Sequence, residues 1–436
     1  MASRSKQPAP LCLTDLPDEV VLEILSRVDI NDAARTSAVS RAWRHRWRHL
    51  GSLVFSSGSD GRVDPVSIAQ SVLLRHLGEV RKFALVSRYP APPPPATDDP
   101  RLDDLLGHLS HPRHGLLALV LSVPYYKMHS SILSCVKLVK LFIEGCLLPN
   151  PTPGFAGLPN LLMLHVRYTS MLKPHLNSGQ LDTLGALISR CPRLTKLELI
   201  VGVVVPGPGL MLRISAPRLR HVVIESWSSN LMVEFNSPLP VLASAKLRLP
   251  LFHYAQEGGF KLLHVLRSIS RVEKLELLDG SGSANFADMM PFKIPVTFEK
   301  LQYLSTDADL GRAMHIVFLL HIIRSCPNIR EIEIKCPVSR RGFQHNFEAN
   351  QEFWDMHGYG DLFRHLRVMK LIDLYLSCNE LDFINLVLSK AQVLEKLSIV
   401  HRPGPKSSSL DACVKVMKFK RASPLAQIDY KASSTQ

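Results

Sequence analysis

The most chemically suggestive segment of the chain is SRAWRHRWRHL, which spans residues 40–50. It holds four arginines, two histidines and two tryptophans. Cations beside aromatic rings can bind nucleic acid, because guanidinium groups pair with phosphates and exposed rings stack on bases. The same residue types can instead form one helix of a protein-binding module.

Helical spacing separates the two residue types in this segment. Trp43, Trp47 and Leu50 lie at i, i+4 and i+7 and therefore share one face of a helix, away from the arginines. A protein that binds single strands would keep its rings exposed beside its cations. The spacing therefore favours a small apolar core or an interface, with nucleic-acid binding as the alternative.

The other residues with catalytic potential are dispersed. Eighteen histidines and eight cysteines occur without a CxxC pair or zinc-ligand spacing. Walker, HExxH, GxSxG and dinucleotide-binding motifs are missing from the sequence. We therefore expect a protein that is not an enzyme and needs no metal or cofactor. A hydrolase whose residues meet only after folding is the open alternative.

Length and composition indicate a folded protein with several domains or a repeat array. The chain has 436 residues, of which 46% are hydrophobic and 21% are charged. Its net charge of +14 favours acidic partners without choosing among them. A secretory signal and a membrane-spanning run are not apparent, so we expect no membrane association, location in the nucleus and/or cytoplasm, and reduced thiols.

The first fifty residues predict a separate module of three short helices. Asp18 and Glu19 suit the positive end of a first helix, with Pro17 in its first turn. Its apolar stripe consists of Val21, Ile24, Leu25 and Val28. A domain this small buries little core by itself, so a partner is expected to stabilise it.

Residues 13–50 resemble the F-box. The resemblance rests on the Leu-Pro start, the apolar first helix, a small-residue second helix over 33–38, and the V-x-R-x-W pattern at 39–43. It implies docking on the Skp-type adaptor of a cullin–RING ubiquitin ligase. The residues that it implies at this interface are Leu16, Pro17, Val20, Ile24, Leu25, Val28 and Trp43. Several of them could instead only hold the three helices together.

From residue 80 onward one short phrase recurs. It consists of an apolar residue, two variable residues, an apolar residue, one variable residue and an apolar residue. It begins twelve times, at residues 80, 116, 138, 161, 194, 219, 242, 272, 301, 329, 366 and 394. The mean spacing of about 28.5 residues resembles that of leucine-rich repeats. Each unit is predicted to add one parallel strand to a concave face and to return through a helix or loop.

Small residues and prolines support this register. Proline often lies two positions before the phrase, where it ends the preceding helix. Cys135, Cys191 and Cys326 lie three positions before it, which predicts buried apolar side chains. The Asn/Cys position that follows the strand in regular repeats is matched only by Cys146 and, loosely, by Thr169.

The C-terminal part resembles the FBD region of plant F-box proteins. Glu380 and Leu381 form the "EL" that opens a helix in that region, and "VLEKLSI" follows it. The closing phrase is RASPLAQIDY at residues 421–430. The usual glycine-bearing turn before "EL" is replaced by LYLSCN. The whole chain therefore resembles a plant F-box/leucine-rich-repeat protein.

These patterns predict an α/β chain in which a three-helix F-box precedes an irregular leucine-rich-repeat solenoid. The expected organisation is a disordered N-terminus (1–12), the F-box (13–50), a linker and first repeats with a proline-rich loop (51–110), the solenoid (111–400), an FBD-like region (361–430) and a disordered tail (431–436). The resemblance implies a substrate-recognition subunit of an SCF-type ligase, whose repeats bind a target protein. An acidic or phosphorylated target would suit the excess of cations. The alternative is a repeat-based scaffold or nucleic-acid-associated protein without a ligase role.

Overall fold

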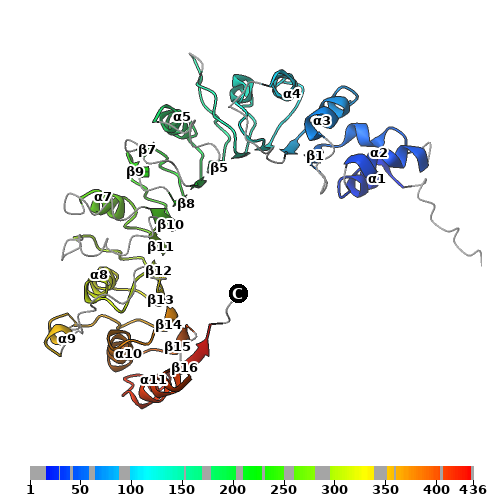
Figure 1. The fold of residues 1–436 in the computed structure, drawn as a ribbon. Coiled ribbons are helices and arrows are strands. Elements are labelled where there is room, and N and C mark those ends of the chain that lie inside the picture. Colours follow the sequence, from blue (N-terminus) through cyan, green and yellow to red (C-terminus); the bar gives the residue numbers. More distant parts are fainter. Residues whose placement is uncertain are drawn as a thin grey trace, which may run out of the picture. The chain divides into compact units, whose positions relative to one another are not determined.

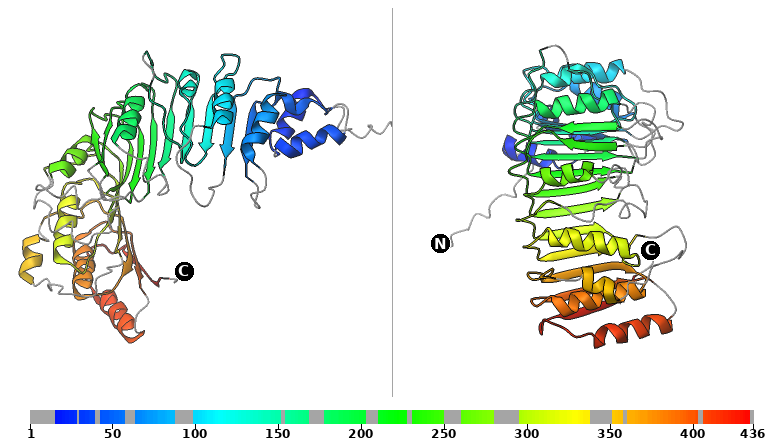
Figure 2. Two further views of the ribbon diagram at one scale, coloured as in Figure 1. Left: turned by 45° about the horizontal axis from the view of Figure 1, so that its top comes forward. Right: turned by 90° about the vertical axis from the view of Figure 1, so that its left-hand side faces the viewer.

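The computed structural model has a mixed α/β fold dominated by parallel strands, which confirms the predicted fold class (Figures 1 and 2). Residues 1–166 and 167–436 form two compact units. The structure describes residues 16–28, 30–39, 43–57, 64–87, 99–151, 154–168, 178–202, 210–227, 231–249, 260–279, 295–337, 351–357, 360–402 and 406–433.

The first unit joins the N-terminal module to the first repeats. Its strands β1 (Ser52–Ser56), β2 (Lys82–Val86), β3 (Ala118–Ser122) and β4 (Lys140–Glu144) pair in parallel in this order. The intervening helices are α3 (Pro65–Leu73), α4 (Pro100–Leu109) and the 3₁₀ helix η3 (Ser130–Ser134). Helices α3 and α4 both begin with proline after an aspartate cap, because proline is already set for the first helical position and the carboxylate accepts a free N–H.

The second unit is a longer stack of the same kind. Its parallel strands, in spatial order, are β6 (Lys196–Val201), β8 (His221–Ser226), β10 (Ser244–Leu249), β11 (Lys274–Asp279), β12 (Tyr303–Asp307), β13 (Glu331–Lys335), β14 (Val368–Leu374), β15 (Lys396–His401) and β16 (Gln427–Ala432). Strand β5 (Met163–Tyr168) lies at the boundary between the units. Within this unit the strands line the inner side of a curve and the helices lie on its outer side (Figure 1).

The outer layer of the second unit is irregular. It contains helices α5 (Ser178–Ser189), α7 (Phe260–Ser268), α8 (Ala313–Arg324), α9 (Gln351–His357), α10 (Cys378–Lys390) and α11 (Lys406–Lys418). Two repeats return instead through strands β7 (Leu210–Ile214) and β9 (Leu231–Phe235), which pair with each other. Helix α5 approaches β7 closely at Gly185, where a Cβ atom would lie 2.8 Å from the carbonyl oxygen of Arg213, so glycine is required there.

The predicted repeat register is confirmed. Each of the twelve phrases begins two residues before a strand; the phrase at 394, for example, precedes β15 at Lys396. The backbone bonds around each strand start explain this regularity. The carbonyl of Arg330 accepts the N–H groups of Arg367 at 2.8 Å and Val368 at 3.0 Å, and neighbouring repeats use the same arrangement.

The buried cysteines are also confirmed. Cys135, Cys191 and Cys326 all lie in the core. The thiol of Cys326 donates to the carbonyl of Ile322 at 3.1 Å, which satisfies its only hydrogen without a partner chain or metal. Cys146 is buried as well and donates to the carbonyl of Val123 at 3.2 Å, whereas Thr169 lies outside the described residues.

The N-terminal module differs from its prediction in the third helix. Helices α1 (Asp18–Leu25) and α2 (Ile30–Val39) form as expected, but the third element is only the 3₁₀ helix η2 (Arg46–His49). Its N–H groups bond three residues back, as in the bond from Leu50 to Trp47. The prediction of a full helix over 40–50 is therefore wrong, because β1 begins at Ser52 and the chain between 43 and 50 closes only tight turns.

Some expectations fall outside the described residues. These are the disordered N-terminus, the proline-rich loop up to residue 98, and the last three residues of the predicted tail. The beginning of the predicted tail is ordered, because Lys431 and Ala432 form the end of β16.

Candidate functional site

Helix α1 and the turn after it expose an apolar stripe. Val20, Ile24 and Val28 are spaced four residues apart and are 42%, 38% and 46% exposed. Four-residue spacing places side chains one above another on a single helix face. On the other face, Val21 and Leu25 are buried in the module. Helix α1 therefore carries apolar residues on two faces, of which the described residues cover only one.

The start of α1 is held without a described side-chain cap. The carbonyl of Pro17 accepts the N–H groups of Val20 and Val21, both at 3.1 Å. Asp18 forms an ion pair with Arg46, which ties the first turn of α1 to η2. The exposed stripe is thus presented on an element fixed at its base.

The predicted adaptor-binding residues divide into three groups. Pro17, Val20, Ile24 and Val28 are exposed, whereas Leu16 and Trp43 are half-buried. Leu25 is only 1% exposed and belongs to the core of the module, which agrees with the alternative that some of these residues only hold the helices together. The sequence could not separate it from Ile24, because adjacent residues on a helix are only about 100° apart and both fit a broad apolar face.

The module is built into the first repeats of its unit. The carbonyl of Arg48 accepts the N–H groups of Leu77 at 2.9 Å and Gly78 at 3.0 Å. Nε2 of His76 lies 2.9 Å from the carbonyl oxygen of Leu50. A Cβ atom on Gly78 would come within 2.8 Å of the Cα of His49, so only glycine permits this approach.

The face of the strands that points away from the helices in the second unit carries paired charges. Lys370 lies 2.6 Å from Glu331 and 3.8 Å from Glu333. Further pairs on this face are Lys196–Glu198, Lys246–Glu225, Lys274–Glu276, Lys335–Glu333 and Lys396–Asp429. Because lysines and carboxylates alternate there, this face does not account for the excess positive charge of the chain.

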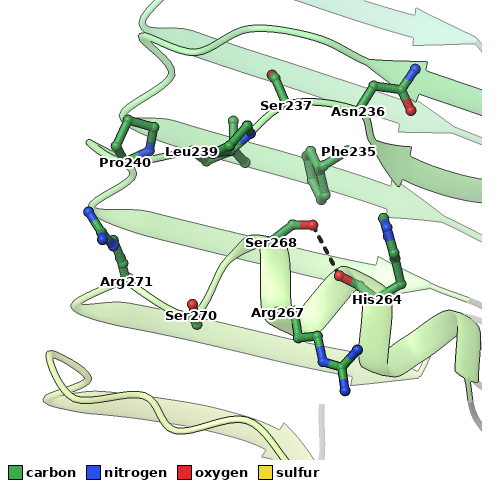
Figure 3. A pocket seen from close by; sticks show the side chains of 11 residues that line it. Phe235, Asn236, Ser237, Leu239, Pro240, His264, Arg267, Ser268, Ser270 and Arg271 are labelled. Carbon is green, nitrogen blue, oxygen red and sulfur yellow. Dashed lines mark hydrogen bonds between the residues drawn. The ribbon is translucent and has the colours of Figure 1, made fainter.

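A pocket of about 500 Å³ with both charged and apolar lining residues lies beside the C-terminal half of α7 (Figure 3). It is lined by the loop from Phe235 to Pro240 and by side chains between His264 and Arg271. Arg267 and Arg271 line it and form no ion pair with any residue that the structure describes, and no carboxylate contributes to the lining. Guanidinium groups in such a setting can bind phosphate or carboxylate.

Hydroxyl groups complete this pocket. The Ser268 hydroxyl donates to the carbonyl of His264 at 3.0 Å, as the dashed line in Figure 3 shows. The Ser237 hydroxyl is buried and has no hydrogen-bond partner among the described residues. It is therefore a donor that a ligand could satisfy.

Comparison with known proteins identifies the N-terminal module. Residues 13–55 match the F-box domain family, five residues beyond the predicted end. The chain contains an F-box. An F-box/FBD/LRR-repeat protein of Arabidopsis thaliana is 26% identical to this F-box protein over 449 residues, covering 96% of this chain and 98% of the relative. A second Arabidopsis thaliana protein of that description is 21% identical over 394 residues, covering 78% of each chain.

A solved structure gives a more distant comparison. The leucine-rich repeat-containing protein LegL7 of Legionella pneumophila shares 14% identity with the F-box protein, with a TM-score of 0.31, over 71% of this chain and 90% of that one. The resemblance of the chain to plant F-box/FBD/leucine-rich-repeat proteins is thus confirmed by its relatives, whose names carry all three features.

The described part of the F-box protein shows neither a metal site nor a membrane-spanning helix. Within those residues, no three His, Cys, Asp or Glu side chains come together as a metal site. None of the described helices is long and apolar enough to cross a bilayer. The pocket arginines were not predicted from the sequence, because the segment RSISR carries no motif and gains its meaning only from the loop folded over it.

Proposed function

We propose that this F-box protein recruits target proteins to a cullin–RING ubiquitin ligase by docking its α1 stripe on a Skp-type adaptor. The observation that carries the proposal is the exposure of Val20, Ile24 and Val28 within the segment that matches the F-box. Covering these three partly exposed side chains would contribute about 1 kcal/mol each before the cost of association, and Pro17 and Leu16 would add to the contact.

The repeats then hold the target near the ubiquitin-charged enzyme. A held target experiences a high effective concentration of the reactive thioester, so the F-box protein itself carries out no bond chemistry. We place this work in the cytosol or the nucleus, where thiols such as those of Cys191 and Cys326 stay reduced.

The pocket beside α7 supports an acidic or phosphorylated target. Arg267 and Arg271 are exposed cations without a described acidic partner, and buried Phe235 and Leu239 give the pocket an apolar floor. A phosphorylated side chain would place its oxygens on the guanidinium groups and its carbons on this floor. The paired charges of the strand face would contribute register and specificity more than affinity.

Titration calorimetry between the full chain and a purified Skp-type adaptor tests the docking proposal. Ile24→Asp should weaken binding at least about a hundredfold, because an ionised carboxylate would be buried in an apolar contact. Val136→Asp is the matched control, since Val136 is also exposed and lies in the same unit. The proposal is ruled out if the adaptor does not bind the native chain, or if it binds the Ile24→Asp variant as tightly as the native chain.

The target class needs a separate experiment. Phosphopeptides from a digested proteome would be passed over the full chain and over an R267A/R271A variant, with R364A as an exposed arginine control. Phosphopeptides should be retained by the native and R364A proteins and lost from the double variant. Equal retention by all three proteins would exclude a role of the pocket in target recognition, whereas the proposal of adaptor docking would be unaffected.

A further inference from the structure

The C-terminal end of the repeat stack is open. Strand β16 pairs with β15 and, within the described residues, has no strand on its other side. An uncovered edge strand presents a row of backbone N–H and C=O groups that can pair with another chain. Such edges are usually protected in soluble proteins, which makes the exposed edge of β16 a candidate binding surface.

Core positions are only partly covered at this end. In β15, Leu397 and Ile399 are fully buried by the repeats on both sides. The parallel register aligns them with Ile428 and Tyr430 of β16, which are only half-buried. These two side chains occupy core positions of a repeat whose outer neighbour is missing from the described part of the chain.

Helix α11 continues the same open apolar surface. Leu410, Val414 and Met417 share one helix face and are 66%, 51% and 44% exposed. The buried residues of α11, Ala412 and Val416, lie on a different face, and α11 packs on α10. Terminal repeats of soluble solenoids normally carry a polar outer face, whereas this one is apolar.

Arg421 connects the helix and the strand. The guanidinium group of Arg421 lies 3.9 Å from the sulfur of Met417 and donates to the carbonyl of Ala426 at 3.0 Å. It therefore joins the end of α11 to the start of β16, and Figure 1 shows the two elements side by side at the end of the stack. Leu425, which is 69% exposed, lies in the same connection.

The charged residues of α11, β16 and the segment between them are mostly positive. The cations include Lys415, Lys418, Lys420, Arg421 and Lys431. Of the acids nearby, Asp429 is already paired with Lys396 at 2.8 Å, which leaves Asp411. A second copy of the chain would bring like charges together, so the surface favours a different, acidic partner.

We propose that β16 and α11 bind an extended segment of a second protein, which adds a strand to the sheet. The apolar side chains of that strand would cover Ile428, Tyr430, Val414 and Met417. Its alternate residues would face the other side of the sheet, where Asp or Glu would pair with Lys431 across the new strand pair. This surface is separate from the α1 stripe, so the inference does not depend on adaptor docking.

Selection from a phage-displayed library of random peptides on the full chain tests the proposal. Selected peptides should alternate apolar residues with Asp or Glu and should protect the amides of β16 from hydrogen exchange. A V414E/M417E variant should bind them at least about tenfold more weakly. Val393→Glu is the control, since Val393 is an exposed apolar residue of the same unit at a different place.

A charge exchange keeps the test independent of folding. Lys431→Glu should weaken the binding of acidic peptides and strengthen the binding of the same peptides with Lys in place of Glu. General damage to the fold would weaken both. Peptides that bind the V414E/M417E variant normally, or that leave β16 exchange unchanged, would overturn the proposal. A dimer of the full chain that dissociates in V414E/M417E would also overturn it, because the occupant would then be a second copy.

Discussion

The buried carboxylate of Glu380 accepts the backbone N–H of Ser377 at 2.7 Å, and the Ser377 hydroxyl in return accepts the N–H of Glu380 at 3.4 Å. This reciprocal capping box begins α10. Glu380 also accepts the N–H of Tyr375 at 3.2 Å. The "EL" of the FBD-like region thus has a structural role, because one carboxylate organises the whole turn before the helix.

Replacing Glu380 with alanine should lower the free energy of unfolding of the second unit by about 2 kcal/mol. The substitution would remove the buried carboxylate that accepts these two N–H groups and holds the turn before α10. Ser377→Ala removes one cap and should cost about 1 kcal/mol. Urea unfolding followed by circular dichroism measures both, and an E380A protein as stable as the native one would contradict the role given to this carboxylate.

The turn before Glu380 holds a leucine in a conformation that favours glycine. Leu376 has a φ of 63°, in the left-handed region. This conformation costs a residue with a Cβ about 1 kcal/mol or more, which exceeds the extra chain entropy that glycine brings to the unfolded state. Leu376→Gly should therefore be neutral or slightly stabilising in thermal unfolding.

Leu376→Ile is the matched comparison for that turn. It keeps the volume and hydrophobicity of the side chain but adds a branch at Cβ, which the left-handed conformation tolerates worst. We expect a loss of about 1 kcal/mol. Equal melting temperatures for the glycine and isoleucine variants would show that backbone conformation does not control this turn.

Stability of the first unit should fall in mild acid. Burial, followed by the nearby Arg113 guanidinium, lowers the pKa of His114 to about 4. The ring accepts the N–H of Val80 on Nδ1 at 3.2 Å, a bond that protonation of this nitrogen would destroy. Burial also lowers the pKa values of His76 and His108.

The sign of this effect follows from proton binding. The unfolded chain, with a histidine pKa near 6.5, binds more protons than the folded chain between about pH 6.5 and 4. Stability should therefore be complete above pH 7 and decline as the pH falls through this window, by on the order of 1 kcal/mol for His114. His114→Gln should flatten the decline of melting temperature, and an unchanged slope would exclude His114 as a contributor.

Adjacent residues of α1 should separate binding from stability. Leu25→Ala should cost about 2–4 kcal/mol of folding free energy, because it empties a buried site. Ile24→Ala should change stability by less than about 1 kcal/mol while weakening adaptor binding at least about tenfold. Calorimetry and thermal unfolding on the same two proteins check this, and reversed effects would assign the two faces of α1 the opposite way.

The repeat strands could be predicted because their apolar positions recur with a fixed pattern that local sequence determines. The same pattern also exists at Leu50, Leu53 and Phe55, which precede and form β1. This repeat phrase was not predicted, because Leu50 also fits the helical spacing that predicts a helix over residues 40–50. Strands β7 and β9 are too short for alternation alone to distinguish them from loops, and their pairing is decided by tertiary contact.

The candidate sites were less predictable than the fold. Helical spacing selects the apolar residues of α1 but does not say which of them the module covers, so Ile24 and Leu25 look alike. Arg267 and Arg271 line a common pocket only because the loop after β9 folds beside them. Net charge indicates cations somewhere on the protein, whereas their pairing on the strand face, as at Lys370, depends on the register of neighbouring repeats.

Residues 46–50 belong to the F-box and also hold the loop that leads into β2, because the carbonyls of Arg48 and Leu50 bond to it. The F-box of this protein therefore cannot be removed or exchanged without disturbing the first repeats. A shortened chain that starts at residue 51 would lose these bonds and would lack α2, which packs on β1. Its loss of binding would therefore reflect damaged repeats as well as the missing adaptor contact. Chimeras between such proteins should be spliced beyond β2, and single surface substitutions are the sounder way to silence docking.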